Sequence, residues 1–229
     1  MKYYFALLAF TFVYLSGFSQ QITYSQWKEE AKNNMALIPK YGNLPKTEQQ
    51  KDADAILVKT FLEQHETHRK SSETLVKMGF NYLHRGDLET AMYRFNQAFL
   101  LDPTNEDVFW GFGRIYFTFG DYEAANKQYN EGLAINPKSS NIITDIASIH
   151  MAIYENTKNE KELDKAIEIF KKAYAIDSEN QNVLFKLSAA YFYKNDCANA
   201  WIFHDKCKKL GGKPLTADYT KALTAKCNR

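Results

Sequence analysis

The stretch "MGFNYLHRGDLETAMYRFNQAFLLDP", residues 78–103, decides the fold, because small residues stand at regular positions among large apolar ones. These small residues are Gly79, Ala91 and Ala98. A side chain no larger than that of Ala lets two helices approach to the short end of the usual separation of about 8 to 10 Å. Aromatic side chains then fill the space beside the contact. The stretch therefore predicts two closely packed helices.

The same pattern returns 34 residues further along the chain. The positions that recur are large apolar, small or turn-forming residues of the same kind in both copies. They are Leu75, Gly79, Tyr82, Ala91, Phe95, Ala98 and Pro103, matched by Phe109, Gly113, Tyr116, Ala125, Tyr129, Gly132 and Pro137. A fixed interval of this length indicates a repeat protein, in which each unit buries its apolar face against the next.

This pattern resembles the tetratricopeptide repeat, a helix-turn-helix unit of about 34 residues. Two more divergent copies follow, one opening at Ile143 and one at Leu184. The resemblance implies an all-α helical solenoid of about four repeats, with N-terminal helices and a C-terminal capping helix. The expected units are 72–105, 106–139, 140–180 and 181–213.

The third unit is seven residues longer between its two halves than the first. We expect the insertion in the polar stretch 155–161, where it would lengthen the turn between the paired helices, since loops tolerate added length. Gly86–Asp87, Gly120–Asp121 and Asn195–Asp196 should end one helix and begin the next. Gly and Asn suit the left-handed position after a helix, and Asp caps the following one.

Residues 20–71 should form an N-terminal helical cap on the first repeat. Helices are predicted from Tyr24 to Ile38 and from Thr47 to His68. The apolar face of the first would hold Trp27, Ala31, Met35 and Ile38, and that of the second Ile56, Leu57, Thr60 and Phe61. Residues 214–229 should form a capping helix with Leu215, Tyr219, Ala222 and Leu223 facing inward.

Residues 1–19 are predicted to be a signal peptide. Lys2 gives a positive start, residues 3–18 are nearly all apolar, and Gly17 and Ser19 are small, so cleavage is expected before Gln20. An uncleaved membrane anchor is the alternative, although the apolar run is shorter than the roughly 20 residues of a spanning helix. The protein is therefore expected to be exported to the periplasm or the medium, without an integral membrane segment in the mature chain.

The chain's charge is nearly balanced, with 29 basic and 27 acidic residues and no long run of either sign. This argues against nucleic acid as the main partner, because neutralising phosphates needs a clustered basic face. Its 229 residues are 45% hydrophobic, which is enough to bury a core. Five prolines and ten glycines favour helices over a strand-and-turn fold.

Three cysteines lie near the C-terminus: Cys197, Cys207 and Cys227. Cys197 and Cys207 are ten residues apart on one predicted helix, about 15 Å at the helical rise, so they cannot bond to each other. Cys197 begins the last repeat's second helix, and Cys227 ends the closing helix beside it. We therefore predict a Cys197–Cys227 disulfide, with free thiols as the alternative, and a buried packing role for Cys207.

No catalytic motif is apparent, and we expect neither an enzyme nor a bound cofactor. His65 and His68 could share a helix face, and His204 and Cys207 another. Neither pair has a third and fourth ligand at usable spacing, so no metal site is predicted.

The resemblance implies that the first helix of each repeat lines a concave groove. Carried over position by position, the groove would hold Val76, Phe80, Leu83, Trp110, Arg114, Phe117, Thr144, Ser148, Met151, Phe185, Ala189 and Phe192, with Tyr219 added by the cap. The partner-binding residues predicted within it are Phe80, Leu83, Trp110, Arg114, Phe117, Met151, Phe185, Phe192 and Tyr219. Arg114 is the one strong cation in this set, which makes an acidic C-terminal peptide a poor ligand.

This apolar, aromatic set has two interpretations. Exposed aromatic patches tend to be interaction sites, so the groove would bind a peptide or a partner's helix. Alternatively, the N-terminal helices or a second copy of the chain cover it. The expected function is therefore an exported protein–protein interaction module. The alternative is a structural or oligomerising scaffold subunit of a cell-envelope complex.

Overall fold

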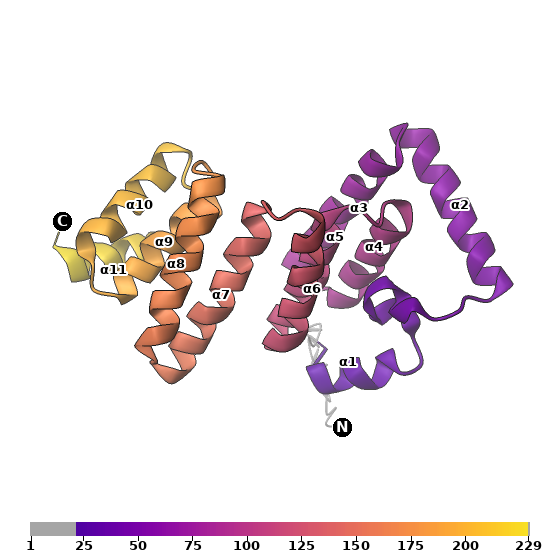
Figure 1. Cartoon of the computed structure of the whole chain (residues 1–229), viewed down its shortest axis with the longest axis horizontal. Coiled ribbons are helices and arrows are strands. Elements are labelled where there is room, and N and C mark those ends of the chain that lie inside the picture. Colours follow the sequence, from indigo (N-terminus) through magenta and orange to yellow (C-terminus); the bar gives the residue numbers. More distant parts are fainter. Residues whose placement is uncertain (1–21, 229) are drawn as a thin grey trace, which may run out of the picture.

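The computed structural model describes residues 22–228, and within them every regular element is a helix. Four antiparallel helix pairs follow one another along the molecule (Figure 1). The pairs are α3 (His68–His84) with α4 (Leu88–Leu101), α5 (Glu106–Thr118) with α6 (Tyr122–Ile135), α7 (Ser140–Thr157) with α8 (Glu160–Ile176), and α9 (Gln181–Tyr193) with α10 (Cys197–Lys209). The predicted all-α solenoid of four helix-turn-helix units is confirmed.

The small residues lie where the helices touch. A Cβ atom added to Gly79 would come within 2.5 Å of the Phe95 ring, and one added to Gly111 would overlap the same ring. Phe95 of α4 therefore packs against backbone from both α3 and α5. Ala91 and Ala98 are fully buried beside it. The recurring small residues thus let the second helix of one unit contact the first helices of two units.

The turns inside the units have the predicted chemistry. Gly86 and Gly120 follow α3 and α5 with positive φ angles of 80° and 77°. Asp87 and Asp121 then accept hydrogen bonds from the backbone N–H groups of Thr90 and Ala124, which lie in the first turns of α4 and α6. Each turn therefore ends one helix and caps the next.

The insertion in the third unit does not lengthen a turn, so that prediction was wrong. Helix α7 has 18 residues and α8 has 17, compared with 13 and 14 for α5 and α6. Lys158 closes α7 in a left-handed conformation and Asn159 caps α8. The added residues therefore extend both helices, because the polar stretch continues the helical pattern on each side of a short turn.

The N-terminal region also differs from its prediction. Its first helix is α1 (Tyr24–Ala31), followed by two 3-10 turns, η1 (Met35–Leu37) and η2 (Pro39–Asn43), and then α2 (Glu48–His65). The predicted helix to Ile38 is too long. The Asn34 side chain caps η1, and Pro39 cannot continue an α-helix. Lys40, Tyr41 and Asn43 then take positive φ angles, which sharply turn the chain.

This N-terminal segment packs along α4 and α6 rather than only on the first repeat. The Asn96 side chain of α4 donates hydrogen bonds to the Ala36 and Ile38 carbonyls at 2.8 and 3.0 Å. The Tyr24 hydroxyl donates to Asp121 at the start of α6, at 2.5 Å. The segment therefore spans the second helices of the first two units.

Helix α2 is only partly packed against the array. Leu57 and Phe61 contact the core, but Ile56 is 67% exposed and Thr60 also faces outward. The prediction that all four share a buried face was therefore wrong. At the other end, α11 (Ala217–Cys227) closes the array with Leu223 buried, whereas Ala222 is exposed, contrary to the prediction.

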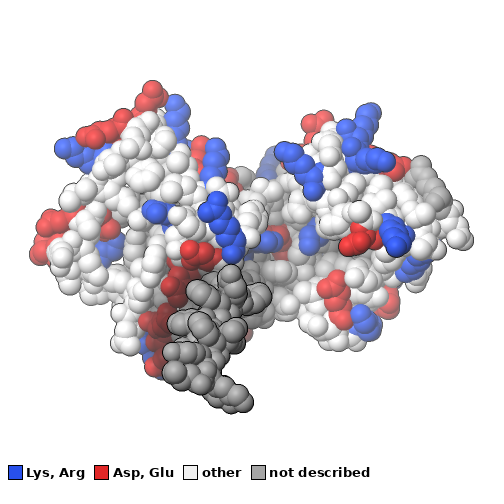
Figure 2. Space-filling model, turned by 180° about the vertical axis from the view of Figure 1, so that it is seen from behind, with Lys and Arg blue, Asp and Glu red and all other residues white. Residues whose placement is uncertain are grey.

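In the view from behind (Figure 2), positive and negative side chains are interspersed over both halves, and acidic side chains also form a band in the lower part of the left half. None of the helices within residues 22–228 combines the length and apolarity needed to cross a membrane. The predicted signal peptide, residues 1–19, lies outside the described part of the chain.

Candidate functional site

An aromatic hollow of about 430 Å³ lies on the side of the array formed by the first helices. Helices α5, α7, α9 and α11 line it, with Tyr122 at the start of α6. Its lining residues are Phe117, Tyr122, Ser148, Met151, Ala152, Glu155, Phe185, Lys186, Ala189, Phe192, Tyr193 and Tyr219. Five of the nine residues predicted to contact a partner therefore meet in one place: Phe117, Met151, Phe185, Phe192 and Tyr219. We call this feature the aromatic hollow.

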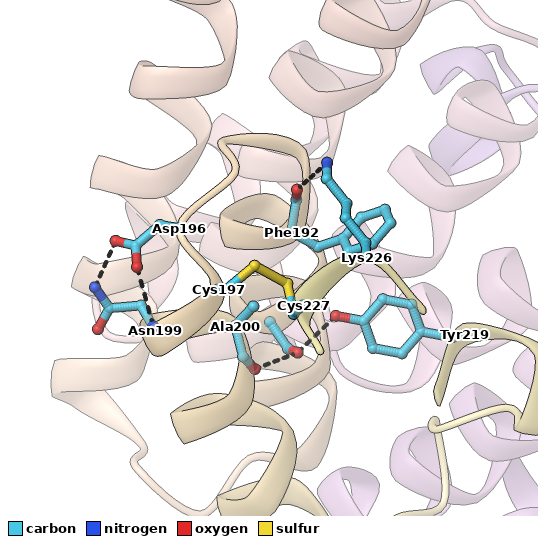
Figure 3. The surroundings of a disulfide bond; sticks show 9 residues. Phe192, Asp196, Cys197, Asn199, Ala200, Tyr219, Lys226 and Cys227 are labelled. Atoms are coloured by element: carbon cyan, nitrogen blue, oxygen red, sulfur yellow. Dashed lines mark hydrogen bonds between the residues drawn. A yellow bond between two sulfur atoms is a disulfide. The ribbon is translucent and has the colours of Figure 1, made fainter. Parts of the chain in front are cut away.

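Helix α11 completes the wall of the hollow next to α9. The Tyr219 ring meets the rings of Phe185 and Phe192 edge to face, with centroids 5.3 and 6.0 Å apart. The Tyr219 and Ser188 hydroxyl oxygens share a hydrogen bond of 2.6 Å (Figure 3). Burial raises the pKa of Tyr219 to about 12, so its hydroxyl remains protonated at neutral pH. These contacts hold the Tyr219 ring in place between α11 and α9.

A buried carboxylate lies on the same side of the array and was missed from the sequence. Asp145 of α7 is 1% exposed and accepts a hydrogen bond from Trp110 Nε1 at 2.6 Å. Arg114 donates to its other oxygen at 3.4 Å. Asp145 thus ties Trp110 and Arg114 of α5 to the next repeat. The sequence does place Asp145 among apolar residues of α7, which could have indicated a buried carboxylate. Its charged partner Arg114, which compensates for the burial, lies 31 residues away in the sequence.

Lys186 is a second cation on this side, so Arg114 is not alone as the sequence suggested. Its side chain lines the aromatic hollow. Burial lowers the pKa of Lys186, while the negative charge of Asp145 opposes that shift. The hollow is therefore mostly apolar, with one basic side chain, Lys186, and one acidic side chain, Glu155, in its wall.

The other predicted partner-binding residues lie outside the hollow. Phe80 packs against Trp110, with ring centroids 4.3 Å apart, so the two extend an aromatic row from α5 to α3. Leu83 is 8% exposed and belongs to the core, and it does not line the hollow, so its role as a contact residue stays a prediction. Val76 and Thr144 are also buried.

The N-terminal helices do not cover the hollow. The first residue in its lining is Phe117, so no residue of the described N-terminal segment lines it. That segment contacts α4 and α6, α2 also contacts α3, and Tyr24 and Trp27 pack against Phe119 at the end of α5. Within residues 22–228, the alternative in which these helices bury the groove therefore does not hold for the aromatic hollow.

The predicted disulfide is present in the structure. Cys197 is the first residue of α10 and Cys227 the last of α11, with Cα atoms 5.4 Å apart (Figure 3). Cys207 is a fully buried free thiol that donates to the Gln181 carbonyl at 3.4 Å, which confirms its packing role. Burial raises the pKa of the Cys207 thiol and so disfavours the reactive thiolate.

The histidine pairs do not form metal sites in the described chain. His65 ends α2 and His68 begins α3, so they are not on one helix as predicted. His68 Nδ1 lies 3.0 Å from the Leu101 carbonyl, and His204 Nε2 lies 3.2 Å from the Thr220 hydroxyl. Within residues 22–228, no group of three His, Cys, Asp or Glu side chains is arranged to hold a metal ion.

Comparison with known proteins agrees with the repeat architecture. The tetratricopeptide repeat family model matches residues 82–147. The crystal structure of TTC0263, a thermophilic TPR protein of Thermus thermophilus, superposes with a TM-score of 0.57 at 14% identity. That similarity covers 68% of this chain and 80% of TTC0263 and shows the fold alone.

Two further solved structures are more distant. PilF of Pseudomonas aeruginosa is 20% identical with a TM-score of 0.49, covering 61% of each chain. The MamA protein is 20% identical with a TM-score of 0.45, covering 72% of this chain and 86% of that one. A search of curated proteins finds no match. The family match places tetratricopeptide repeats within residues 82–147, and the helical array has the fold of tetratricopeptide repeat proteins.

Proposed function

We propose that this protein is an interaction module that binds a segment of a partner protein in the aromatic hollow. The observation that carries the proposal is the convergence of aromatic rings from α5, α9 and α11 on one hollow of about 430 Å³. This volume lies in the range of pockets that accept compact ligands, and interface energy often concentrates in a few side chains that fill such pockets. A large aromatic or aliphatic side chain of the partner would be the anchor.

Aromatic residues next to the hollow would determine the direction in which the partner segment lies. Phe80 and Trp110 continue the aromatic surface toward the N-terminal end, and Asp145 holds Trp110 in place. A preorganised aromatic side chain loses little conformational freedom on binding. An extended segment or one turn of helix would therefore place its anchor in the hollow and lie along this row.

We also propose that the protein acts outside the cytoplasm, in the periplasm or the medium. The apolar N-terminal stretch with small residues at its end supports export. The Cys197–Cys227 disulfide supports an oxidising compartment, where such bonds persist.

The alternative proposal, a scaffold subunit that associates with itself, is favoured by α2. This helix has 18 residues, none of them buried, and Ile56 is 67% exposed. Val58 and Leu62 of the same helix line a shallow apolar depression, and contiguous exposed apolar surface is typical of association sites. Light scattering over a range of concentrations tests it: a rising mass that Ile56→Glu abolishes would support a scaffold, and a constant monomer mass would contradict it.

The binding proposal is tested by selecting peptides from a random library on the oxidised protein and measuring their affinity by fluorescence anisotropy. Phe117→Ala and Phe185→Ala should each weaken the selected peptide by at least about tenfold, as expected for pocket-lining contacts. Tyr174→Ala is the control, because this half-buried ring lies on α8 away from the hollow. Equal losses in all three variants, or selection of no peptide, would contradict the proposal.

A further inference from the structure

Helix α11 has few attachments to the rest of the array. Of its 11 residues, Leu223 alone is buried. Its side-chain contacts to α9 and α10 include the Tyr219–Ser188 hydrogen bond and the contact between Thr220 and His204. A short helix with so little buried apolar surface is marginal by itself. The disulfide at its last residue is therefore a main restraint on its position.

The disulfide restrains the same helix that completes the hollow. Cys227 follows Lys226, whose ammonium donates to the Phe192 carbonyl at 2.8 Å and lies 4.4 Å from the centre of the Phe192 ring. Figure 3 shows Phe192 and Lys226 beside the disulfide. Tyr219, on the same helix as Lys226, forms its hydrogen bond with Ser188 of α9. Loss of the bond would therefore release the Tyr219 wall and the cation over Phe192 together.

The two cysteines of the bond, Cys197 and Cys227, are partly exposed, whereas the third cysteine, Cys207, is fully buried. Disulfide exchange requires access of a thiolate to a sulfur atom. Reduction would therefore act on one bond without rearrangement to Cys207.

We propose that the Cys197–Cys227 disulfide is a redox switch that holds α11 in place as a removable wall of the aromatic hollow. This inference rests on the proposed binding function and adds its regulation. The reductant is a dithiol. One of its thiolates attacks a sulfur of the bond, the S–S bond breaks, and the departing thiolate takes a proton. The second reductant thiol then resolves the mixed disulfide, so the reductant becomes a disulfide and the protein gains two thiols.

Reduction lowers the affinity of the hollow because it removes one of its walls. Without Tyr219, the rings of Phe185 and Phe192 lose an edge-to-face neighbour and face water. The four repeats do not depend on α11 for their helix contacts, so the array itself remains folded. The expected signature is local opening at the C-terminus.

Hydrogen–deuterium exchange of the full protein, oxidised and treated with dithiothreitol, tests the release of α11. Amides of residues 217–227 should exchange at least about tenfold faster after reduction, while those of α5–α8 are unchanged. The Cys197→Ser and Cys227→Ser double variant should behave like the reduced protein, and dithiothreitol should change it no further. Unchanged protection of α11, or simultaneous loss of protection throughout the array, would overturn the proposal.

The effect of reduction on binding is tested with a fluorescein-labelled peptide selected on the oxidised protein, whose affinity is measured before and after reduction. Reduction should weaken it at least about tenfold, and Tyr219→Ala with the disulfide intact should do the same while α11 stays protected. Equal affinity before and after reduction, with α11 released, would overturn the switch but leave the hollow as a site. Insensitivity to Phe117→Ala and Phe185→Ala would instead show that the proposed function has failed.

Discussion

Phe95 and Tyr129 occupy equivalent positions in the first two repeats, and each lies against a glycine of the first helix in its own unit. A Cβ atom on Gly79 would collide with Phe95, and one on Gly113 would overlap the Tyr129 ring. The two residues differ by a hydroxyl. The Tyr129 hydroxyl is buried and has no hydrogen-bond partner among the described residues. The same repeat position therefore packs against a glycine in both units, but only in the second unit does its side chain carry a polar atom.

Replacing Tyr129 by Phe should therefore leave the free energy of unfolding unchanged or raise it by up to about 2 kcal/mol, because an unsatisfied buried hydroxyl destabilises the folded state. The reciprocal change Phe95→Tyr is the matched control and should lower the free energy of unfolding by about 1 to 3 kcal/mol. Urea denaturation measures both. A loss of more than about 1 kcal/mol in Tyr129→Phe would show that the hydroxyl is satisfied in solution.

Removal of the Asp145 carboxylate should lower the stability of the contact between α5 and α7. Asp145→Ala leaves the Arg114 guanidinium and the Trp110 N–H without their shared acceptor, so we expect a loss of about 2 to 4 kcal/mol in unfolding free energy. Asp145→Asn keeps an acceptor and should lose less. Urea denaturation followed by Trp fluorescence measures the difference. Identical stability of the parent protein, Asp145→Ala and Asp145→Asn would show that the Asp145 carboxylate does not stabilise the fold.

At the scale of elements, the repeat was predictable and its exceptions were not. Gly79 and its copy Gly113 identify a local packing rule that each unit repeats, so the sequence reveals it. The course of the N-terminal segment depends on Asn96, which binds carbonyl groups about 60 residues away. The sequence pattern carries no comparable signal. The hollow was partly predicted, because position in the repeat identifies which face of a helix a residue occupies. It does not identify Lys186, which lines the hollow, or Asp145, which binds Trp110 and Arg114.

The turn between α7 and α8 offers a prediction about helix ends. Lys158 has a φ angle of 56°, a conformation that costs a residue with a side chain about 1 kcal/mol relative to Gly. Lys158→Gly should therefore raise the free energy of unfolding by up to about 1 kcal/mol. Lys161→Gly, in the first turn of α8, is the control and should lower it by a similar amount. If thermal melting gives the same sign for both variants, the described turn is incorrect.

At the scale of the whole molecule, three partly buried tyrosines predict that the folded protein loses stability in alkali. Burial raises the pKa values of Tyr41, Tyr116 and Tyr219 to about 12. Below pH of about 10, these hydroxyls are protonated in both the folded and unfolded chain, and their contribution to stability is fully present. Between about 10 and 12, the unfolded chain loses protons that the folded chain retains, so stability falls as pH rises.

Urea denaturation at several pH values in this range, with phenolate absorbance, measures the effect. Tyr116→Phe removes one of the three groups and should make the decline less steep. A decline of the same slope in Tyr116→Phe and the parent protein would contradict the assignment for Tyr116.

The fold places its four repeats so that one side of the array carries the aromatic hollow and the other carries the N-terminal segment. The central claim is that a partner binds the first of these two sides. Nuclear magnetic resonance of the isotope-labelled protein, titrated with the peptide selected on it, tests this claim most directly. Chemical shifts should change around Phe117, Met151, Phe185 and Tyr219, which line the hollow. Changes confined to α4, α6 and the N-terminal segment would contradict the account.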